Sequence, residues 1–289
     1  MDYIGRFAPS PTGPLHYGSL VTALASFLDA KHHGGKWLLR IDDLDPPRES
    51  PDAPKQIIKQ LLAFGLQWDF EVFYQSKRLI AYDYALNLID DSTFHCICSR
   101  TPGSKVYSGC CRKKRHAKPS KPHSVRFRVP SHNLSIKDRR TGLQTWNLEK
   151  EVGDFIVKRK DGQYAYQLAV VVDDAYCSVT HIVRGNDLLN STPRQLALYE
   201  KLGLSPPEYL HIPVLVDKCG NKLSKQAFAK PIETRNILDT TRSALADLGQ
   251  STHNCCLTQK ALIEKAIPAW NPSRIPKADK LLAPAPHLT

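Results

Sequence analysis

A short apolar segment at residues 3–8 is followed, after a Pro-rich stretch, by apolar positions that recur every three or four residues. The first pattern predicts a buried strand, and the second predicts a helix that runs from Ser19 to the Gly34-Gly35 pair. Residues 37–41 predict the next buried strand. Strand and helix therefore alternate, which predicts an α/β fold with a parallel sheet covered by helices.

Later segments extend this pattern. The apolar run at residues 166–174 predicts a strand that returns to the sheet, and residues 193–202 predict a helix. Beyond Lys225 the pattern is mainly helical. Residues 96–130 are rich in Lys, Arg, Pro and Ser, which predicts an insertion rather than a part of the core.

The junction between the first strand and the first helix carries the run His16-Tyr17-Gly18-Ser19. A helix N-terminus offers unpaired backbone N–H groups and the positive end of the helix dipole, and both favour a phosphate. Gly18 lets a nucleotide lie against the backbone. His16 can donate to phosphate oxygens and stabilise the charge of a leaving pyrophosphate.

A second segment, Lys222-Leu223-Ser224-Lys225, follows about two hundred residues later. We expect a mobile loop that brings its lysines onto the same phosphates. Each segment alone is more typical of an ordinary turn or a solvated loop, but their order, with Pro-Ser-Pro-Thr-Gly in front, predicts an ATP site. The chain has no Gly-x-x-x-x-Gly-Lys motif, which disfavours a P-loop enzyme. The residues predicted to act on ATP are His16, Gly18, Ser19, Lys222 and Lys225.

The net charge of the chain points to a nucleic-acid partner. Its 289 residues include 40 Lys and Arg against 28 Asp and Glu, for a formal charge of +12. Such a surplus favours a polyanion, and beside an ATP motif it favours a nucleic acid. Apolar runs are too short to cross a membrane, and the first residues lack a signal-peptide core. We therefore expect a cytoplasmic protein without membrane contact.

Four of the eight cysteines lie close together, namely Cys96, Cys98, Cys110 and Cys111. In a cytosolic chain such a cluster indicates a metal site or free thiols rather than disulfides. The spacing differs from that of the common Cys-x-x-Cys ribbons, so spacing alone leaves metal binding and buried free cysteines equally open.

Several motifs occur together in one order. They are Arg6-Phe7-Ala8-Pro9-Ser10-Pro11-Thr12-Gly13, His16-Tyr17-Gly18-Ser19, Arg40-Ile41-Asp42-Asp43-Leu44-Asp45, Val183-Arg184-Gly185-Asn186-Asp187 and Lys222-Leu223-Ser224-Lys225. In these motifs the chain resembles the class I glutamyl-tRNA synthetases from residue 1 to about residue 230. Within that family it is most similar to the short paralogues, the glutamyl-Q tRNA(Asp) synthetases. The run Asp45-Pro46-Pro47-Arg48-Glu49, residues 164–174 and the lack of an anticodon-binding half favour this branch.

The resemblance implies a domain organisation and a metal site. It implies a Rossmann-like catalytic domain at 1–95 and 165–200, and an inserted, zinc-bearing, acceptor-binding-like domain at 96–164. Residues 201–289 would hold the Lys222–Lys225 loop and helices, without an anticodon-binding domain. One structural zinc ion would be held by Cys96, Cys98, Tyr107 and Cys111. Cys110 departs from the family pattern and competes for a ligand position.

The resemblance also implies an activity. The enzyme would activate L-glutamate with ATP and Mg²⁺, then transfer it to queuosine in tRNA(Asp), acting as a monomer. The substrate carboxylate attacks the α-phosphate, so no protein nucleophile is required. By resemblance, ATP is bound by His16, Gly18 and Lys225, and glutamate is bound by Arg6, Ser10, Asp42, Tyr166 and Arg184. Guanidinium groups suit a carboxylate, and Asp42 suits an ammonium, although the family normally has Glu at that position.

Three alternatives remain at this point. A truncated glutamyl-tRNA synthetase would charge a tRNA 3′ end, and a non-catalytic paralogue would bind tRNA without activating an amino acid. A nucleotidyl transferase acting on another small acid is the third, because the phosphate-binding motifs do not name the acid. The ATP motifs look intact, which disfavours the non-catalytic alternative.

Overall fold

The computed structural model describes residues 2–98, 106–113, 119–223 and 230–284, so Ser224 and Lys225 lie outside the described residues. The strands are β1 (Ile4–Phe7), β2 (Lys36–Ile41), β3 (Phe73–Tyr74), β4 (Thr93–Cys96), β5 (Ser124–Phe127), β6 (Asn133–Asp138), β7 (Gly142–Asn147), β8 (Phe155–Lys158), β9 (His181–Gly185), β10 (Glu208–Ile212), β11 (Val214–Val216) and β12 (Lys280–Leu282). The helices are α1 (Tyr17–His32), α2 (Ala53–Ala63), α3 (Leu79–Leu88), α4 (Tyr166–Tyr176), α5 (Thr192–Lys201), α6 (Ile237–Asp247) and α7 (Gln259–Ala269).

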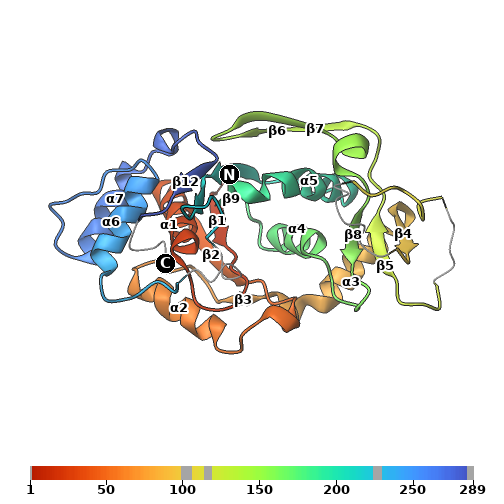
Figure 1. Ribbon diagram of the computed structural model, residues 1–289, viewed down its shortest axis with the longest axis horizontal. Coiled ribbons are helices and arrows are strands. Elements are labelled where there is room, and N and C mark those ends of the chain that lie inside the picture. Colours follow the sequence, from red (N-terminus) through yellow and green to blue (C-terminus); the bar gives the residue numbers. More distant parts are fainter. Residues whose placement is uncertain (1, 99–105, 114–118, 224–229, 285–289) are drawn as a thin grey trace.

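Parallel pairing organises the centre of the molecule. β1 pairs with β2, and β2 pairs with β3, in the same direction. A second parallel pair, β9 and β10, lies against β1, where the backbone N–H of Thr180 donates to the carbonyl of Ile4 at 2.9 Å. Helix α1 connects β1 to β2 and packs on the strands (Figure 1). The predicted α/β alternation is therefore confirmed.

Helix α1 is buried on most of its surface. The strands lie on one side of it, and α6 and α7 pack on another (Figure 1). Leu20, Leu24 and Leu28 are each at most 1% exposed. Burying a leucine side chain stabilises a fold by about 1.5–3 kcal/mol, so these contacts hold the helix firmly in the core. The N-terminus of α1 is thereby fixed beside the ends of the strands.

Residues 166–174 form a helix, so the predicted strand is wrong. Three successive valines favour a strand by local propensity, but tertiary contacts override that preference. Leu168 and Val171 belong to a core cluster shared with α3 and α5. The helix also brings Asp173 and Asp174 into the protein, where other side chains bind both carboxylates. The helix predicted at 193–202 is present as α5.

The inserted segment forms a small sheet and a long hairpin. β4, β5 and β8 pair antiparallel, at the right of Figure 1. β6 and β7 form a hairpin that returns along the upper edge of the molecule towards β9 and β12 (Figure 1). Its turn reaches the central strands, because the backbone N–H of Arg139 donates to the carbonyl of Tyr209 at 2.9 Å. The hairpin therefore links the insertion to the α/β core.

The C-terminal part contributes strands as well as helices. β10 follows residue 200 but pairs with β9, so the parallel sheet continues into the region assigned to 201–289. α6 and α7 pack on each other and on α1, at the left of Figure 1, and β12 pairs with β11. The three-part division of the chain stays a prediction. Within the described ranges, the helices are too short or too polar to span a bilayer.

Candidate active site

The carboxyl ends of β1 and β9 and the first turn of α1 border a cavity of about 480 Å³. Ligands of α/β folds commonly bind at this edge of a parallel sheet. The cavity is lined by nine of the predicted site residues, namely Arg6, Ser10, His16, Gly18, Ser19, Asp42, Tyr166, Arg184 and Lys222. The fold therefore gathers into one place residues that are far apart in the sequence. Lys225 lies outside the described residues.

His16 caps the N-terminus of α1. Its Nδ1 accepts the backbone N–H of Ser19 at 3.3 Å, and its Nε2 lies 2.8 Å from Ser19 Oγ. The same N–H also donates to the carbonyl of His16 at 3.0 Å, and the direction of the contact between Nε2 and the hydroxyl follows from the ring tautomer. A Cβ on Gly18 would lie 3.2 Å from the imidazole, so glycine lets the ring pack closely on the first turn. The ring and the positive end of the helix both border the cavity.

The side of the cavity formed after β1 and β2, here called the β1–β2 wall, holds alternating charges. Arg6 Nε donates to Asp174 at 3.1 Å, and Arg40 Nη1 donates to the same carboxylate at 2.6 Å. Arg40 Nε donates in turn to Asp42 at 2.6 Å. All four residues are buried. Two positive and two negative charges thus compensate one another within this wall.

The two carboxylates of the β1–β2 wall differ in pKa. Burial raises the pKa of Asp42 to about 6, although Arg40 acts to lower it. Burial also acts to raise the pKa of Asp174, but Arg6 and Arg40 outweigh it and hold that pKa below its ordinary value. Arg40 occupies two hydrogen-bond positions on Asp42, and a carboxylate offers about four. Asp42 can therefore also accept a hydrogen bond from a cationic ligand.

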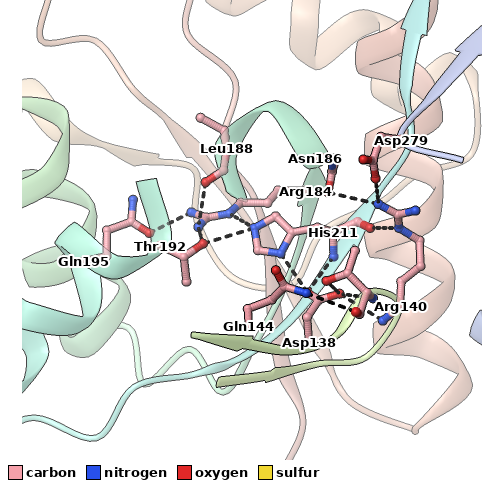
Figure 2. A network of polar contacts seen from close by, with 11 residues as sticks. Asp138, Arg140, Gln144, Arg184, Asn186, Leu188, Thr192, Gln195, His211 and Asp279 are labelled. Carbon is pink, nitrogen blue, oxygen red and sulfur yellow. Dashed lines mark hydrogen bonds and ion pairs between the residues drawn. The ribbon is translucent and has the colours of Figure 1, made fainter. Parts of the chain in front are cut away.

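Another part of the lining, here called the β9 wall, presents one guanidinium with neutral partners (Figure 2). Arg184 donates from Nε to His211 at 3.0 Å and from Nη1 to Gln195 at 2.8 Å. Its Nη2 donates to Thr192 at 2.9 Å and to the carbonyl of Leu188 at 3.4 Å. These bonds use four of the five N–H groups of the guanidinium. Among the described residues, no carboxylate pairs with Arg184, so its positive charge is available to a ligand anion.

Other predicted residues lie nearer the surface. Tyr166 is the first residue of α4 and is 36% exposed, and Ser10 is exposed in the loop after β1. Lys222 Nζ binds Asp187 at 2.6 Å, and both side chains are partly exposed. A phosphate that bound Lys222 would therefore compete with Asp187.

The cysteine cluster lies in the insertion, apart from the cavity residues. The sulfur atoms of Cys96, Cys98 and Cys111 lie within 4.8 Å of one another, and all three are free thiols. Sulfur ligands about 2.3 Å from a tetrahedral zinc ion are about 3.8 Å apart. The observed separation of 3.4 Å between Cys98 Sγ and Cys111 Sγ is close to that value. The cluster can therefore hold a metal ion of the kind that thiolates prefer.

A fourth ligand position has two candidates. Tyr107 Oη lies 3.4 Å from Cys96 Sγ and accepts the backbone N–H of Cys111 at 2.9 Å. Cys110 is exposed, and its Sγ lies 3.0 Å from Cys98 Sγ and 3.4 Å from Tyr107 Oη. The choice between tyrosine and cysteine, open from the sequence, stays open.

Several residues that contact the cavity-lining side chains carry no role predicted from the sequence. Arg40 and Asp174 lie inside motifs that had been singled out, but their ion pair joins positions 134 residues apart. A carboxylate that follows three valines is a usable signal, because a charge in an apolar segment is seldom buried without a partner. His211 contacts Arg184 through the pairing of β9 with β10, and no local pattern marked it.

Known proteins are similar to this chain in sequence and in fold. Residues 4–248 match the family described as tRNA synthetases class I (E and Q), catalytic domain. The glutamyl-Q tRNA(Asp) synthetase of Pseudomonas putida is 45% identical over 99% of this chain and 98% of its own length. The protein of the same name from Chromobacterium violaceum is 47% identical over 95% of each chain.

A solved structure agrees with this match. The glutamate tRNA ligase of Elizabethkingia meningosepticum, crystallised in complex with its amino acid, has a TM-score of 0.81. It is 24% identical, and the match covers 100% of this chain and 68% of that one. Because residues 4–248 match the family model and the two relatives are 45% and 47% identical over nearly the full chain, the chain belongs to the class I tRNA synthetase (E and Q) catalytic-domain family. The expected resemblance and the expected α/β fold are confirmed.

Proposed function

We propose that this protein activates L-glutamate with ATP and transfers the glutamyl group to queuosine in tRNA(Asp). The observation that carries the first step is that Asp42 and Arg184 line one cavity, and that Arg184 has no carboxylate partner among the described residues. Glutamate carries one ammonium and two carboxylates, so its binding requires both a negative and a positive protein group. Family membership and the names of the near full-length relatives support the second step.

Within this proposal, the two walls divide the recognition of glutamate. Arg184 binds the side-chain carboxylate, because one of its N–H groups remains unused and no carboxylate among the described residues pairs with its charge. Asp42 accepts the α-ammonium, and Arg6 contributes positive potential near the α-carboxylate. Tyr166 and Ser10 add hydroxyl groups at the mouth of the cavity. Glutamine, which lacks the second negative charge, would be disfavoured.

ATP then binds with its phosphates at the N-terminus of α1. His16 supplies the imidazole, Gly18 allows close approach of the nucleotide, and Ser19 supplies a hydroxyl, while Lys222 supplies positive charge. Lys225, which lies outside the described residues, would add a second positive charge. The α-carboxylate of glutamate attacks the α-phosphorus, the bond to pyrophosphate breaks, and the lysines and His16 stabilise the leaving group. A hydroxyl group of queuosine then attacks the activated carbonyl of glutamyl-adenylate, and AMP leaves. Mg²⁺ is held mainly by the phosphates and water.

Glutamate-dependent exchange of pyrophosphate into ATP tests the activation step. We expect exchange with glutamate in the absence of tRNA, because the proposed binding groups are all on the protein. Aspartate and glutamine serve as matched controls for chain length and charge. Exchange that requires tRNA, or that is equally fast with either control amino acid, would contradict the assignment of the pocket.

We also propose that the cysteine cluster binds one structural zinc ion through Cys96, Cys98, Cys111 and Tyr107. The thiol positions support this assignment. Elemental analysis of protein purified without chelator should give one zinc per chain. Cys111→Ser should lose the metal, whereas the remote, exposed Cys255→Ser should keep it. Loss in Cys110→Ser but not in Tyr107→Phe would transfer the fourth ligand to Cys110, and protein without zinc would contradict the proposal.

The proposed setting of the enzyme is the cytoplasm, with the chain acting as a monomer. The +12 formal charge supports contact with tRNA, since phosphate contacts by Lys and Arg supply most of the sequence-independent affinity for a nucleic acid. Gel filtration of the purified protein with light scattering checks the monomeric state. Salt dependence of tRNA binding checks the electrostatic contribution.

A further inference from the structure

The turn of the β6–β7 hairpin is built around one buried carboxylate. Asp138 is 1% exposed and accepts the backbone N–H groups of Arg140 at 2.9 Å and Thr141 at 2.8 Å. Its second oxygen accepts the backbone N–H of His211 at 3.0 Å and lies 2.7 Å from the Nδ1 of that ring. Burial acts to raise the pKa of Asp138, but hydrogen bonds from His211 and the turn outweigh it and lower the pKa to about 2.

The two ring nitrogens of His211 have fixed roles. Arg184 Nε can only donate, so His211 Nε2, at 3.0 Å, must accept. The ring proton is therefore on Nδ1, which donates to the ionised Asp138. Burial lowers the pKa of His211, which favours the neutral ring that this arrangement requires. Figure 2 shows the resulting line of contacts from Asp138 through His211 to Arg184.

Arg140 attaches the hairpin turn to the same wall. Its Nε donates to the carbonyl of His211, and its Nη2 donates to Asn186 at 2.9 Å and to Asp279 at 3.0 Å (Figure 2). Asn186 follows Arg184 by two residues. Arg140 therefore joins the hairpin to β10, to Asn186 and to the segment before β12.

We propose that Asp138 and His211 are positioning residues that orient the Arg184 guanidinium for the substrate carboxylate. This inference rests on the proposed function, in which Arg184 binds glutamate. A planar guanidinium held at Nε by a ring that is itself fixed from behind has little freedom left to lose when a carboxylate binds. The β6–β7 hairpin then connects the insertion to the amino-acid pocket and helps to orient Arg184.

Two substitutions at one position separate the roles of the ring nitrogens. His211→Gln places an amide oxygen near the position of Nε2 and keeps an acceptor for Arg184. His211→Asn places an amide group near Nδ1, which keeps a donor for Asp138 but removes the acceptor for Arg184. We expect His211→Asn to raise the KM for glutamate about tenfold or more in pyrophosphate exchange, because a hydrogen bond to a charged group is lost. His211→Gln should raise this KM by less than His211→Asn does, to no more than about threefold above the wild type, because the acceptor for Arg184 is kept and only the donor to Asp138 is lost.

Four controls accompany this pair. The KM for ATP should stay unchanged in both variants, and melting curves should show that both fold. His132→Asn alters an exposed histidine that contacts Glu200 and should leave the KM for glutamate unchanged. In Arg184→Gln, a second substitution His211→Asn should add little to the loss, because His211 acts through Arg184.

The outcomes distinguish this inference from the proposed function. A wild-type protein without glutamate-dependent exchange, or an Arg184→Gln variant with normal KM for glutamate, would overturn the proposed function and this inference with it. A large effect of Arg184→Gln combined with equal effects of His211→Asn and His211→Gln would overturn the positioning role alone. Additive losses in the double variant would overturn it as well.

Discussion

On the β1–β2 wall, Arg6 and Arg40 share two carboxylates, whereas on the β9 wall Arg184 has neutral partners among the described residues. Both walls bury their guanidinium groups, but the first compensates its charges internally and the second does not. The difference shows that burial of an arginine near a cavity does not by itself indicate a ligand site, because a carboxylate of the protein can already neutralise its charge. The uncompensated charge of Arg184 marks where an anionic substrate group should bind.

Within the compensated β1–β2 wall, Arg40 should contribute mainly to the stability of the fold. We expect Arg40→Met to lower the free energy of unfolding by about 3–5 kcal/mol, because Asp42 and Asp174 would lose a shared buried partner. Lys201→Met removes a surface pair with Asp91 and should cost at most about 1 kcal/mol. Urea unfolding of both variants measures the contrast. Similar midpoints would show that the β1–β2 wall is not held by its ion pairs.

The uncompensated wall should contribute mainly to glutamate binding. Arg184→Gln should raise the KM for glutamate by about thirtyfold or more, as expected when one partner of a buried charge pair is removed. The KM for ATP should change little, and the melting temperature should fall less than in Arg40→Met. Steady-state pyrophosphate exchange gives both constants. A variant that loses stability but keeps its KM for glutamate would reverse the roles of the two walls.

Asp42 connects the two functions of the β1–β2 wall. Asp42→Ala should weaken glutamate binding by about 2 kcal/mol, since the substrate ammonium would lose its carboxylate. Asp42→Glu restores the residue that the family normally has and should be tolerated. Isothermal titration with glutamate compares the variants with the wild type. Equal affinities of Asp42→Ala and the wild type would remove Asp42 from the site.

The pKa of Asp42 predicts a milder effect of pH. Since burial raises this pKa to about 6, the carboxyl is neutral below that pH and negative above it. The ammonium of glutamate needs the negative form, so kcat/KM for glutamate should fall as pH drops through about 6. Asp42→Asn should be less active and lack this acidic limb. An unchanged limb in that variant would assign it to another group.

The sequence predicted the strand–helix–strand start of the fold because its apolar periods were clear and its turns contained Pro and Gly. It predicted four of the nine cavity residues from a helix N-terminus and the order of two motifs, and the other five from the resemblance, although their roles stay predictions. It misjudged residues 166–174, where the preference of valine for strands lost to packing around α4. It did not predict that His211 contacts Arg184, because this contact depends on the pairing of β9 with β10. It also did not predict that Asp138 contacts His211, because this contact depends on the hairpin turn.

Glutamylation of purified tRNA(Asp) tests the central claim most directly. Labelled glutamate should be incorporated into tRNA(Asp) that carries queuosine, and incorporation should persist after removal of the terminal adenosine. The matched tRNA(Asp) with guanine in place of queuosine should remain unlabelled. Labelling of the guanine form, or loss of labelling when the terminal adenosine is absent, would contradict transfer to queuosine and indicate aminoacylation of the 3′ end instead.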